Sequence, residues 1–495
     1  MPDLTSPDSL RTSRSTAETC ELLVRLEQKS DINEHRVGAI QLWPLLRHVL
    51  WVELLRASPA NEQSRPTRDR WLVSRARIAA AVLYNNVTEI FPRDQRKLLD
   101  ETRLFVSRPG YLQYMGESNL YFDRIIDPLF FIARNRYLVA KMYIGSLPED
   151  RRLLLPGFPL RPRSVGHSTK IEHSVGLWVR DAANQVGLCE ESLLARFHIV
   201  LRDFERWYRT GQTLFASMPQ LKRLYLACWY FPDMMGLTAA AKEVGVEVID
   251  VQHGKQGKYQ GMYSWWTRIP EDGYKMMPDR FWCWGRPSCQ DILRASPNRI
   301  IHRPFVGGFP WIDWYRTFIN PSVAGSVSEK TILFTLQGPQ GKSQEPIPDF
   351  IVKFLQNKRF ADWRIRFRNH PNFKEGLGYC QKRLAPVDPS RFTIADQKRN
   401  LYDEFLEVTH HITGYSSCCY EAESFGVPTL LFGEEAKAIY ETDIACGRFS
   451  WTRGDVNDLI AWLEQPLTNH IHRSDQYVES SLSLTAAVLF GDHPV

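Results

Sequence analysis

The chain has 495 residues, a hydrophobic content of 43%, a charged content of 24% and a formal net charge of +6. A chain of this length is too long to fold around a single hydrophobic core, so several domains are expected. The small net charge does not indicate a nucleic-acid-binding protein. No apolar run reaches the roughly 18 residues of a membrane-spanning helix. The nine cysteines show no CxxC pair and no zinc-ligand spacing, which predicts reduced thiols in a cytoplasmic protein and no metal site.

The first predicted elements form a helical N-terminal region. Residues 1–18 are polar and predict a disordered tail without the apolar segment of a secretory signal. Over residues 19–100, apolar residues recur at three- and four-residue spacing, which predicts helices. The most apolar of these, at 39–55, has Pro44 near its first turn. Burial against a neighbouring domain is the favoured interpretation of its apolar face, and peripheral docking on the cytoplasmic face of a membrane is the alternative.

A first α/β domain is predicted over residues 101–320. Short apolar or β-branched runs alternate with helical patterns, and a strand, a helix and a strand within about 30 residues indicate a βαβ unit of a parallel sheet. The predicted strands lie at 103–107, 137–144, 223–230, 246–252 and 299–308, with a helix at 234–245. Residues 309–330 have the composition of a linker.

A second α/β domain is predicted over residues 331–495, where the alternation starts again. Its predicted strands lie at 331–338, 363–371, 392–396, 410–415 and 428–432, with helices at 347–358, 400–408 and 417–425. Arg364, Arg366 and Arg368 alternate along one strand, although a buried parallel sheet keeps its strands apolar. We therefore expect this strand to lie at an edge, or to line a polar cleft with one face. The predicted fold class is α/β, with two doubly wound, Rossmann-like domains facing one cleft.

Polar residues follow the predicted strands at the edge where such sheets bind ligands. His253 follows the strand at 246–252, and Gln337 follows the apolar run TILFTL. His370 follows WRIRFRN, and Ser416 and Ser417 follow HHITGY. Taken singly, a histidine after a strand is more often a turn residue or a structural group. Because these positions recur at corresponding strand ends, we interpret them as a functional site.

The segment TGYSSCCYEAESFGVPTLLF, residues 413–432, predicts a strand, a tight turn, a serine-capped helix and a buried strand. Ser416 or Ser417 is expected to cap the helix, whose free amides can hold a phosphate. Glu421 lies one turn further along the same face and can accept hydrogen bonds from ribose hydroxyls. A plain capped helix with a solvated glutamate is the alternative.

This segment resembles the nucleotide-binding segment of glycosyltransferases of the GT-B fold, in which two hydroxyl residues precede a helix bearing Glu-Ala. RFRNHP (366–371) is similar to the Arg-x-x-His-Pro segment of bacterial capsule and teichoic-acid transferases of that fold, and DVQHGK (250–255) is similar to their Gln-His-Gly segment. MPDRFWCWG (277–285) and LYFDRIIDPLF (120–130) are similar to further segments of these proteins. The resemblance spans residues 100–435 and does not fix the donor.

The resemblance implies a metal-independent glycosyltransferase that needs no cofactor beside its nucleotide-sugar donor. The donor would be a nucleotide-activated sugar, with a CMP- or CDP-linked one as the first candidate, and the acceptor would be a hydroxyl of a cell-surface or secreted polysaccharide. His253 would act as general base or as a hydrogen-bond partner of the transition state, because imidazole accepts a proton near neutral pH. The donor would be held by Gln337, Arg368, His370, Ser416, Ser417 and Glu421, and the acceptor side would include Gln252, Gly254 and Lys255.

Several alternatives remain open. Asp272 lies in IPEDGYK (269–275), which resembles an acidic motif of some bacterial sialyltransferases, so it is a rival base to His253, although Pro-Glu-Asp-Gly is also a good turn sequence. Residues 156–170, basic and rich in proline and glycine, predict a solvated loop or a loop that embraces an anionic acceptor. For the whole protein, the alternatives are an isomerase of the sugar-nucleotide 2-epimerase type and a non-catalytic sugar-nucleotide-binding assembly subunit.

Overall fold

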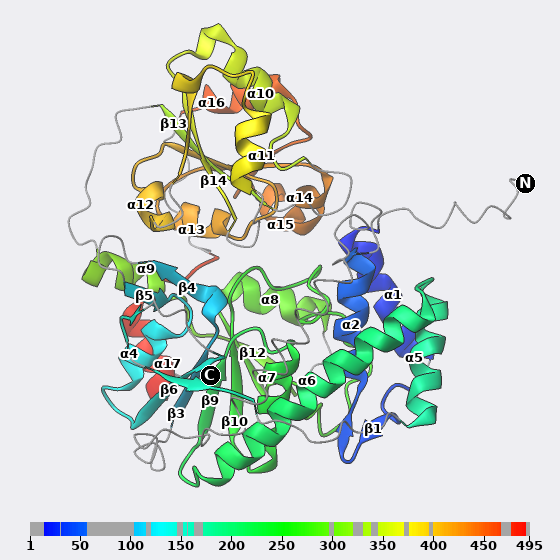
Figure 1. The fold of residues 1–495 in the computed structure, drawn as a ribbon. Coiled ribbons are helices and arrows are strands. Elements are labelled where there is room, and N and C mark those ends of the chain that lie inside the picture. Colours follow the sequence, from blue (N-terminus) through cyan, green and yellow to red (C-terminus); the bar gives the residue numbers. More distant parts are fainter. Residues whose placement is uncertain are drawn as a thin grey trace, which may run out of the picture. The chain divides into compact units, whose positions relative to one another are not determined.

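The chain forms two compact units, each built around a parallel sheet (Figure 1). Unit 1 comprises Met1–Leu112, Asp123–Gly308 and Ser483–Val495, and unit 2 comprises Gln113–Phe122 and Phe309–Leu482. The N-terminal helices are therefore part of unit 1, and the C-terminal residues return to it. The structure, a computed structural model, describes residues 14–29, 31–56, 103–114, 120–145, 152–155, 157–162, 172–296, 301–319, 330–337, 345–370, 376–395, 399–466 and 477–491.

A seven-stranded parallel sheet forms the centre of unit 1. In spatial order its strands are β12 (Arg303–Val306), β11 (Arg280–Cys283), β10 (Glu247–Val251), β9 (Arg223–Leu226), β3 (Arg103–Ser107), β6 (Val139–Ile144) and β8 (Phe158–Leu160). β3 comes first in the chain, and later strands are added on both sides of it, which makes the sheet doubly wound as predicted. β11 was not among the predicted strands, although its residues lie within the quoted segment MPDRFWCWG.

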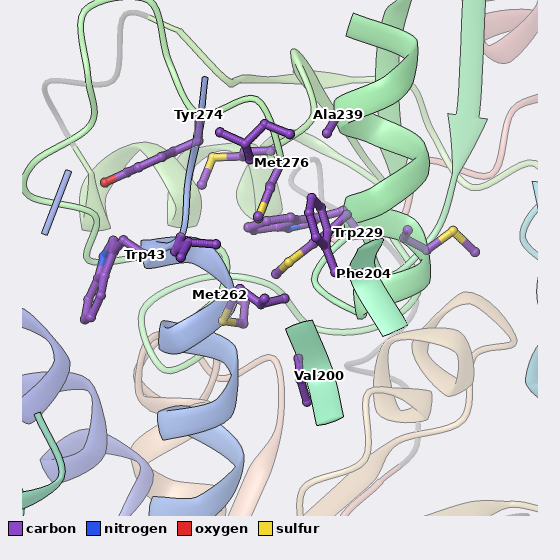
Figure 2. Packing of buried hydrophobic residues seen from close by; sticks show 14 of the residues in the cluster. Trp43, Val200, Phe204, Trp229, Ala239, Met262, Tyr274 and Met276 are labelled. Atoms are coloured by element: carbon purple, nitrogen blue, oxygen red, sulfur yellow. The ribbon is translucent and has the colours of Figure 1, made fainter. Parts of the chain in front are cut away.

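Helices cover this sheet and bury a large apolar core. They are α1 (Thr16–Lys29), α2 (Trp43–Arg56), α4 (Asp127–Ala133), α5 (His173–Gln185), α6 (Glu190–Ala216), α7 (Pro232–Glu243), α8 (Arg286–Ala295) and α17 (Leu482–Phe490). Short strands lie at β1 (Arg36–Val37), β2 (Ile40–Gln41), β4 (Leu112–Tyr114), β5 (Leu120–Asp123) and β7 (Arg152–Leu153). Figure 2 shows Trp43 of α2, Phe204 of α6 and Ala239 of α7 among the core side chains that pack near Trp229.

α2 is a core helix of unit 1. Leu45, Leu46 and Leu50 on it are each 0% exposed, so its apolar face is covered by protein. The predicted burial of residues 39–55 is confirmed, and membrane docking of this face was the wrong alternative. Within the described ranges, no helix is both long enough and apolar enough to cross a bilayer.

A six-stranded parallel sheet forms the centre of unit 2. In spatial order its strands are β15 (Phe392–Ile394), β14 (Arg364–Arg368), β13 (Thr331–Thr335), β16 (His410–Thr413), β17 (Thr429–Phe432) and β18 (Ser450–Thr452). Its helices are α9 (Trp311–Trp314), α10 (Asp349–Gln356), α11 (Gly376–Arg383), α12 (Leu401–Phe405), α13 (Cys418–Ser424), α14 (Glu434–Ile439), α15 (Glu441–Ala445) and α16 (Val456–Leu463). Again the first strand, β13, has later strands on both sides, so the second doubly wound sheet is confirmed.

The arginine-rich strand β14 has a polar face, but it does not lie at the edge. β15 pairs outside it, so the expected edge position was wrong. Arg366 lies 2.6 Å from a carboxylate oxygen of Glu404 and 2.9 Å from one of Glu407. Glu404 belongs to α12, and only 1% of it is exposed. The alternating arginines therefore neutralise carboxylates that pack over the sheet.

The segment predicted to be a linker begins with ordered structure. α9 is followed by a π-helical turn, η6 (Tyr315–Ile319). Trp311 is 0% exposed, and the ring of Phe122 stacks on it with centroids 4.5 Å apart. The linker prediction was wrong for residues 309–319, because polar neighbours concealed the helical spacing of the aromatic residues. Residues 320–329 lie outside the described residues.

Candidate functional site

The carboxyl ends of β3, β9 and β10 form one edge of the unit 1 sheet. These strands are neighbours and parallel, so the residues that follow them lie close together. The edge falls where the strand order reverses, on either side of β3. Arg108 follows β3, Cys228 and Tyr230 follow β9, and His253 follows β10. The expected strand-end position of His253 is confirmed, whereas its neighbours were not predicted.

His253 lies in a cage of tyrosine rings. Its Nε2 is 3.3 Å from the hydroxyl of Tyr230, and ring centroids of Tyr111, Tyr230 and Tyr263 lie 5.7, 6.0 and 6.3 Å from its own. Its Nδ1 is buried and has no hydrogen-bond partner among the described residues. Burial, followed by the positive charges of Arg124 and Arg108, lowers the pKa of His253 to about 3. The ring is therefore neutral at physiological pH, with one nitrogen open to a ligand.

A hydrogen-bonded row leads to this histidine. The hydroxyl of Tyr111 contacts the thiol of Cys228, and that thiol donates to the hydroxyl oxygen of Tyr230 at 3.5 Å. Cys228 has a φ of +58°, in the left-handed region that a residue with a side chain adopts only at a cost. Such strained residues cluster at functional sites. This geometry marks the end of β9 as a candidate site.

Two aspartate side chains, Asp250 and Asp233, lie near the hydrogen-bonded row of Tyr111, Cys228 and Tyr230. Asp250, inside β10, accepts a hydrogen bond of 2.7 Å from the hydroxyl of Tyr263 and one of 3.0 Å from the backbone N–H of Trp229. Burial raises the pKa of Asp250 to about 8, so it is largely protonated at neutral pH. Asp233 lies 3.0 Å from the guanidinium of Arg108, which orients that side chain. Sequence reasoning missed all three, although Arg108 directly follows the predicted strand RLFVS.

The other predicted residues of unit 1 have structural partners. Gln252 is 0% exposed; its amide donates to the carbonyl of Gly254 at 2.8 Å and accepts from the backbone N–H of Trp284 at 2.6 Å. Lys255 lies 3.6 Å from a carboxylate oxygen of Asp291 on α8. Gln252 and Lys255 therefore shape the loop after β10, and an acceptor role is not needed to explain them.

Asp272 lies away from His253. It is exposed in a turn closed by the N–H of Gly273 bonding to the carbonyl of Pro270 at 2.9 Å. Its charge acts on Lys242, which bonds to the carbonyls of Tyr274 and Met277 beside the amino ends of β10 and β11. Asp272 therefore lies at the opposite end of the strand from His253. Of the 156–170 loop, residues 163–170 lie outside the described residues.

A buried ion pair from the N-terminal helices holds the loop after His253. Arg47 of α2 and Glu27 of α1 are both 0% exposed and hydrogen-bond directly. Arg47 also donates to the carbonyl oxygens of Gly261 and Ser264, each at 2.9 Å. Glu27 accepts from the N–H of Thr267 at 2.7 Å. The helices thereby fix the backbone that continues from the candidate site.

In unit 2, the carboxyl ends of β14, β13 and β16 form the corresponding edge. The three strands are adjacent and parallel, and β13 is the point where the strand order reverses. Gln337 follows β13, His370 follows β14, and Ser416 and Ser417 follow β16, all half-buried. The structure therefore brings these predicted residues to one edge of one sheet.

Two buried donors at this edge lack acceptors within the part of the chain that the structure describes. The guanidinium of Arg368 donates through Nη2 to the carbonyl of Arg399 at 2.8 Å, whereas its Nη1 is buried without a hydrogen bond, 3.8 Å from the carboxylate of Glu404. The next residue, Asn400, is 4% exposed; its Oδ1 accepts from the N–H of Tyr402, and its Nδ2 has no partner among the described residues. Burial lowers the pKa of Arg368. Each of these two groups could donate to an oxygen of a ligand.

The serine-capped helix differs from its prediction. Ser417 occupies the N-cap of α13 without a side-chain hydrogen bond, and the hydroxyl of Ser416 accepts from the N–H of Cys418 at 3.4 Å. α13 has only seven residues, so its dipole is small. Glu421 is 1% exposed and accepts from the hydroxyl of Tyr402 at 2.5 Å. The expected ribose-facing position of Glu421 is contradicted, because this carboxylate is enclosed by α12.

A buried histidine lies beneath this edge. His411 of β16 is 0% exposed, and its two ring nitrogens lie 2.9 and 3.0 Å from the hydroxyls of Thr335 and Thr429 on the neighbouring strands. Burial lowers its pKa to about 3. This neutral, fully bonded ring is structural. Among the described residues, no group of three or more His, Cys, Asp or Glu side chains is placed to hold a metal ion.

Comparison with known proteins identifies solved structures of similar fold. No family model and no curated protein matches the sequence. A protein from Listeria monocytogenes, assigned as a UDP-N-acetylglucosamine 2-epimerase, matches with a TM-score of 0.50 at 12% identity over 79% of this chain and 95% of that one. UDP-GlcNAc 2-epimerase from Neisseria meningitidis bound to UDP-GlcNAc gives 0.48 at 11%, over 79% and 99%. The wall teichoic acid polymerase TagF gives 0.43 at 12%, over 85% and 98%.

At this identity, likeness to a solved structure establishes the fold and leaves the activity open. Both units contain a doubly wound parallel sheet, and the Listeria protein shares the arrangement over most of its length. The chain therefore has a fold of the GT-B type, as the resemblance of its sequence motifs implied.

Proposed function

We propose that the protein is a glycosyltransferase that moves a sugar from a nucleotide-activated donor to a hydroxyl of a cell-surface or secreted glycan. The observation that carries the proposal is the open, buried Nδ1 of the neutral His253 at the carboxyl edge of the unit 1 sheet. An enzyme that acts on a hydroxyl needs a polar group held ready in a dry site, and this nitrogen lies at the strand-end edge where such sheets bind ligands. The nine unpaired cysteines support a cytoplasmic location.

Unit 2 is the proposed donor site. Arg368 and Asn400 offer donors that a phosphate or carbonyl oxygen of the nucleotide would satisfy. His370, Gln337 and Ser416 stand at the neighbouring strand ends. A phosphate chain fits donors of this kind, and we retain a cytidine nucleotide, CMP- or CDP-linked, as the first candidate on the resemblance of the sequence motifs.

The proposed reaction balances without a cofactor. The hydroxyl oxygen of the acceptor forms a bond to the anomeric carbon, while the bond from that carbon to the nucleotide phosphate breaks and its electron pair leaves with the phosphate. The proton of the hydroxyl passes to a base or to the departing phosphate. Arg368 would stabilise the developing phosphate charge, and His253 would act on the acceptor oxygen.

A donor panel tests this proposal. The purified chain is incubated with CMP-, CDP-, UDP- and GDP-sugars, with and without a glycan extract, and free nucleotide and sugar identity are measured. Acceptor-dependent nucleotide release is expected. Interconversion of the sugar without an acceptor would replace the proposal with a 2-epimerase-type isomerase, and binding without turnover would replace it with a non-catalytic subunit.

Paired variants locate the two sites. Replacing Ser416 and Ser417 together by alanine should raise the nucleotide Kd with little change in melting temperature, whereas the exposed Ser390→Ala control should leave both unchanged. An unchanged Kd in the double variant would remove the serines from the donor site. His253→Ala should keep donor binding and lose turnover; a fully active variant would move the acceptor-side role elsewhere.

A further inference from the structure

In the hydrogen-bonded row of Tyr111, Cys228 and Tyr230 beside His253, each donor and each acceptor can be assigned in turn. The thiol of Cys228 donates to the hydroxyl oxygen of Tyr230 at 3.5 Å. A thiol carries one proton, so its sulfur must act as acceptor in the contact with Tyr111. The hydroxyl of Tyr111 therefore donates to Cys228. Two of the three links in the row are thus assigned, and both run toward His253.

For the third link, the proton count leaves Tyr230 able to donate. Tyr230 has accepted a hydrogen bond from Cys228, and its own proton remains to be donated. The ring nitrogen Nε2 of His253 lies 3.3 Å from this hydroxyl and is a strong acceptor when it carries no proton. If Nε2 accepts, the proton of the neutral imidazole sits on Nδ1. Nδ1 is then a buried N–H without an acceptor among the described residues.

We infer that Tyr111, Cys228 and Tyr230 fix His253 as the Nδ1–H tautomer, so that His253 meets its ligand as a hydrogen-bond donor to an oxygen atom. The identity of the ligand, a sugar hydroxyl or a phosphate, rests on the proposed function. Cys228 and Tyr230 are positioning residues, and His253 is the group that touches the ligand. Within the reaction proposed above, the acceptor proton then leaves with the departing phosphate and not on His253.

Two further observations support this assignment. The imidazole stays neutral because burial and the nearby arginines lower its pKa to about 3, and such a ring is a poor proton acceptor at neutral pH but a sound N–H donor. The left-handed backbone at Cys228 places the thiol between two tyrosine hydroxyls, at a conformational cost.

The tautomer can be measured without any ligand. The full chain is labelled with ¹⁵N at histidine, and the ring resonances of His253 are identified by their loss in His253→Asn. We expect the one-bond N–H coupling at Nδ1. Tyr230→Phe should shift the ring toward the Nε2–H form, and Cys228→Ser, which keeps the row, should not. The resonances of His411, bonded to two threonines, serve as the control and should stay unchanged in every variant. An Nε2–H ring in the unaltered protein would overturn the inference.

A pair of substitutions tests the donor role in turnover. Asparagine at position 253 places an amide N–H near the site of Nδ1 but accepts no proton there, and alanine removes both functions. Loss of one such donor lowers kcat by about 100- to 1,000-fold. The kcat of His253→Asn should therefore exceed that of His253→Ala by about tenfold or more. Equal, complete loss in both variants would make His253 a base and overturn the inference. If the unaltered protein releases no nucleotide, the proposed function fails, and the resonance measurement still decides the tautomer.

Discussion

Replacing Glu27 by glutamine should destabilise unit 1 and loosen the loop that follows His253. Glu27 accepts hydrogen bonds from Arg47 and from the indole N–H of Trp43, the latter at 2.8 Å, and its second oxygen accepts from the N–H and the hydroxyl of Thr267, both at 2.7 Å. A glutamine fills the same volume but removes the charge, and its amide N–H faces donors. Breaking a buried ion pair in this way costs about 3–5 kcal/mol.

The measurement should resolve the two units. Denaturant-dependent hydrogen exchange read by mass spectrometry separates peptides of α1, α2 and residues 255–268 from those of unit 2. The matched control is Glu191→Gln, which breaks an exposed pair with Arg180 and should cost under about 1 kcal/mol. The double variant Glu27→Gln with Arg47→Met should cost less than the sum of the two single changes, because it leaves no unpaired charge. If Glu27→Gln lowers the free energy of unfolding as little as the control does, the ion pair of Glu27 and Arg47 does not hold this loop.

Three further predictions concern pH, packing and the donor site. Burial lowers the pKa of His411 from 6.5 to about 3, so its contribution to the free energy of unfolding is complete above pH 6.5 and falls by about 1.4 kcal/mol per pH unit on acidification. His411→Gln should therefore reduce the pH dependence of the free energy of unfolding between pH 7 and 4.5. An unaltered pH dependence would contradict the assignment. Gly236→Ala should lower the free energy of unfolding by roughly 1–3 kcal/mol, because the new Cβ would lie 2.7 Å from a backbone nitrogen of α6. Gly176→Ala, which has open space around it, should not destabilise the protein. Equal unfolding midpoints for the two variants would contradict the close approach of Gly236 to α6. Arg368→Met should raise the nucleotide Kd at least about tenfold by calorimetry, and the exposed Arg359→Met should leave it unchanged; equal affinities would exclude Arg368 from the site.

The sheets were readable in the sequence because buried parallel strands are continuous apolar runs. RLFVS corresponds to β3, the run at β10 was placed to within one residue at each end, and the run at β13 was predicted three residues too long. Other elements were not predicted, among them the four-residue β11 and the 27-residue α6. Register and neighbours are long-range properties, so the pairing of β3 with β9 could not be read from either segment.

The candidate sites were predicted in position and only partly in composition. His253 and Arg368 were found because polar residues follow apolar runs at strand ends. Tyr111 and Cys228 were missed, because the hydrogen-bonded row that they form brings together segments more than 100 positions apart. Glu421 was misread because nothing in the helix sequence indicates that its carboxylate bonds to the hydroxyl of Tyr402.

Nucleotide binding at the carboxyl edge of the unit 2 sheet is the central claim, and hydrogen–deuterium exchange with and without CMP, CDP or UDP tests it most directly. The account predicts slower exchange of the backbone that follows β13, β14 and β16, and of the Arg399–Asn400 peptide, with no change at the amino ends of the same strands. Saturating nucleotide that protects only other parts of the chain, or none of it, would contradict the account.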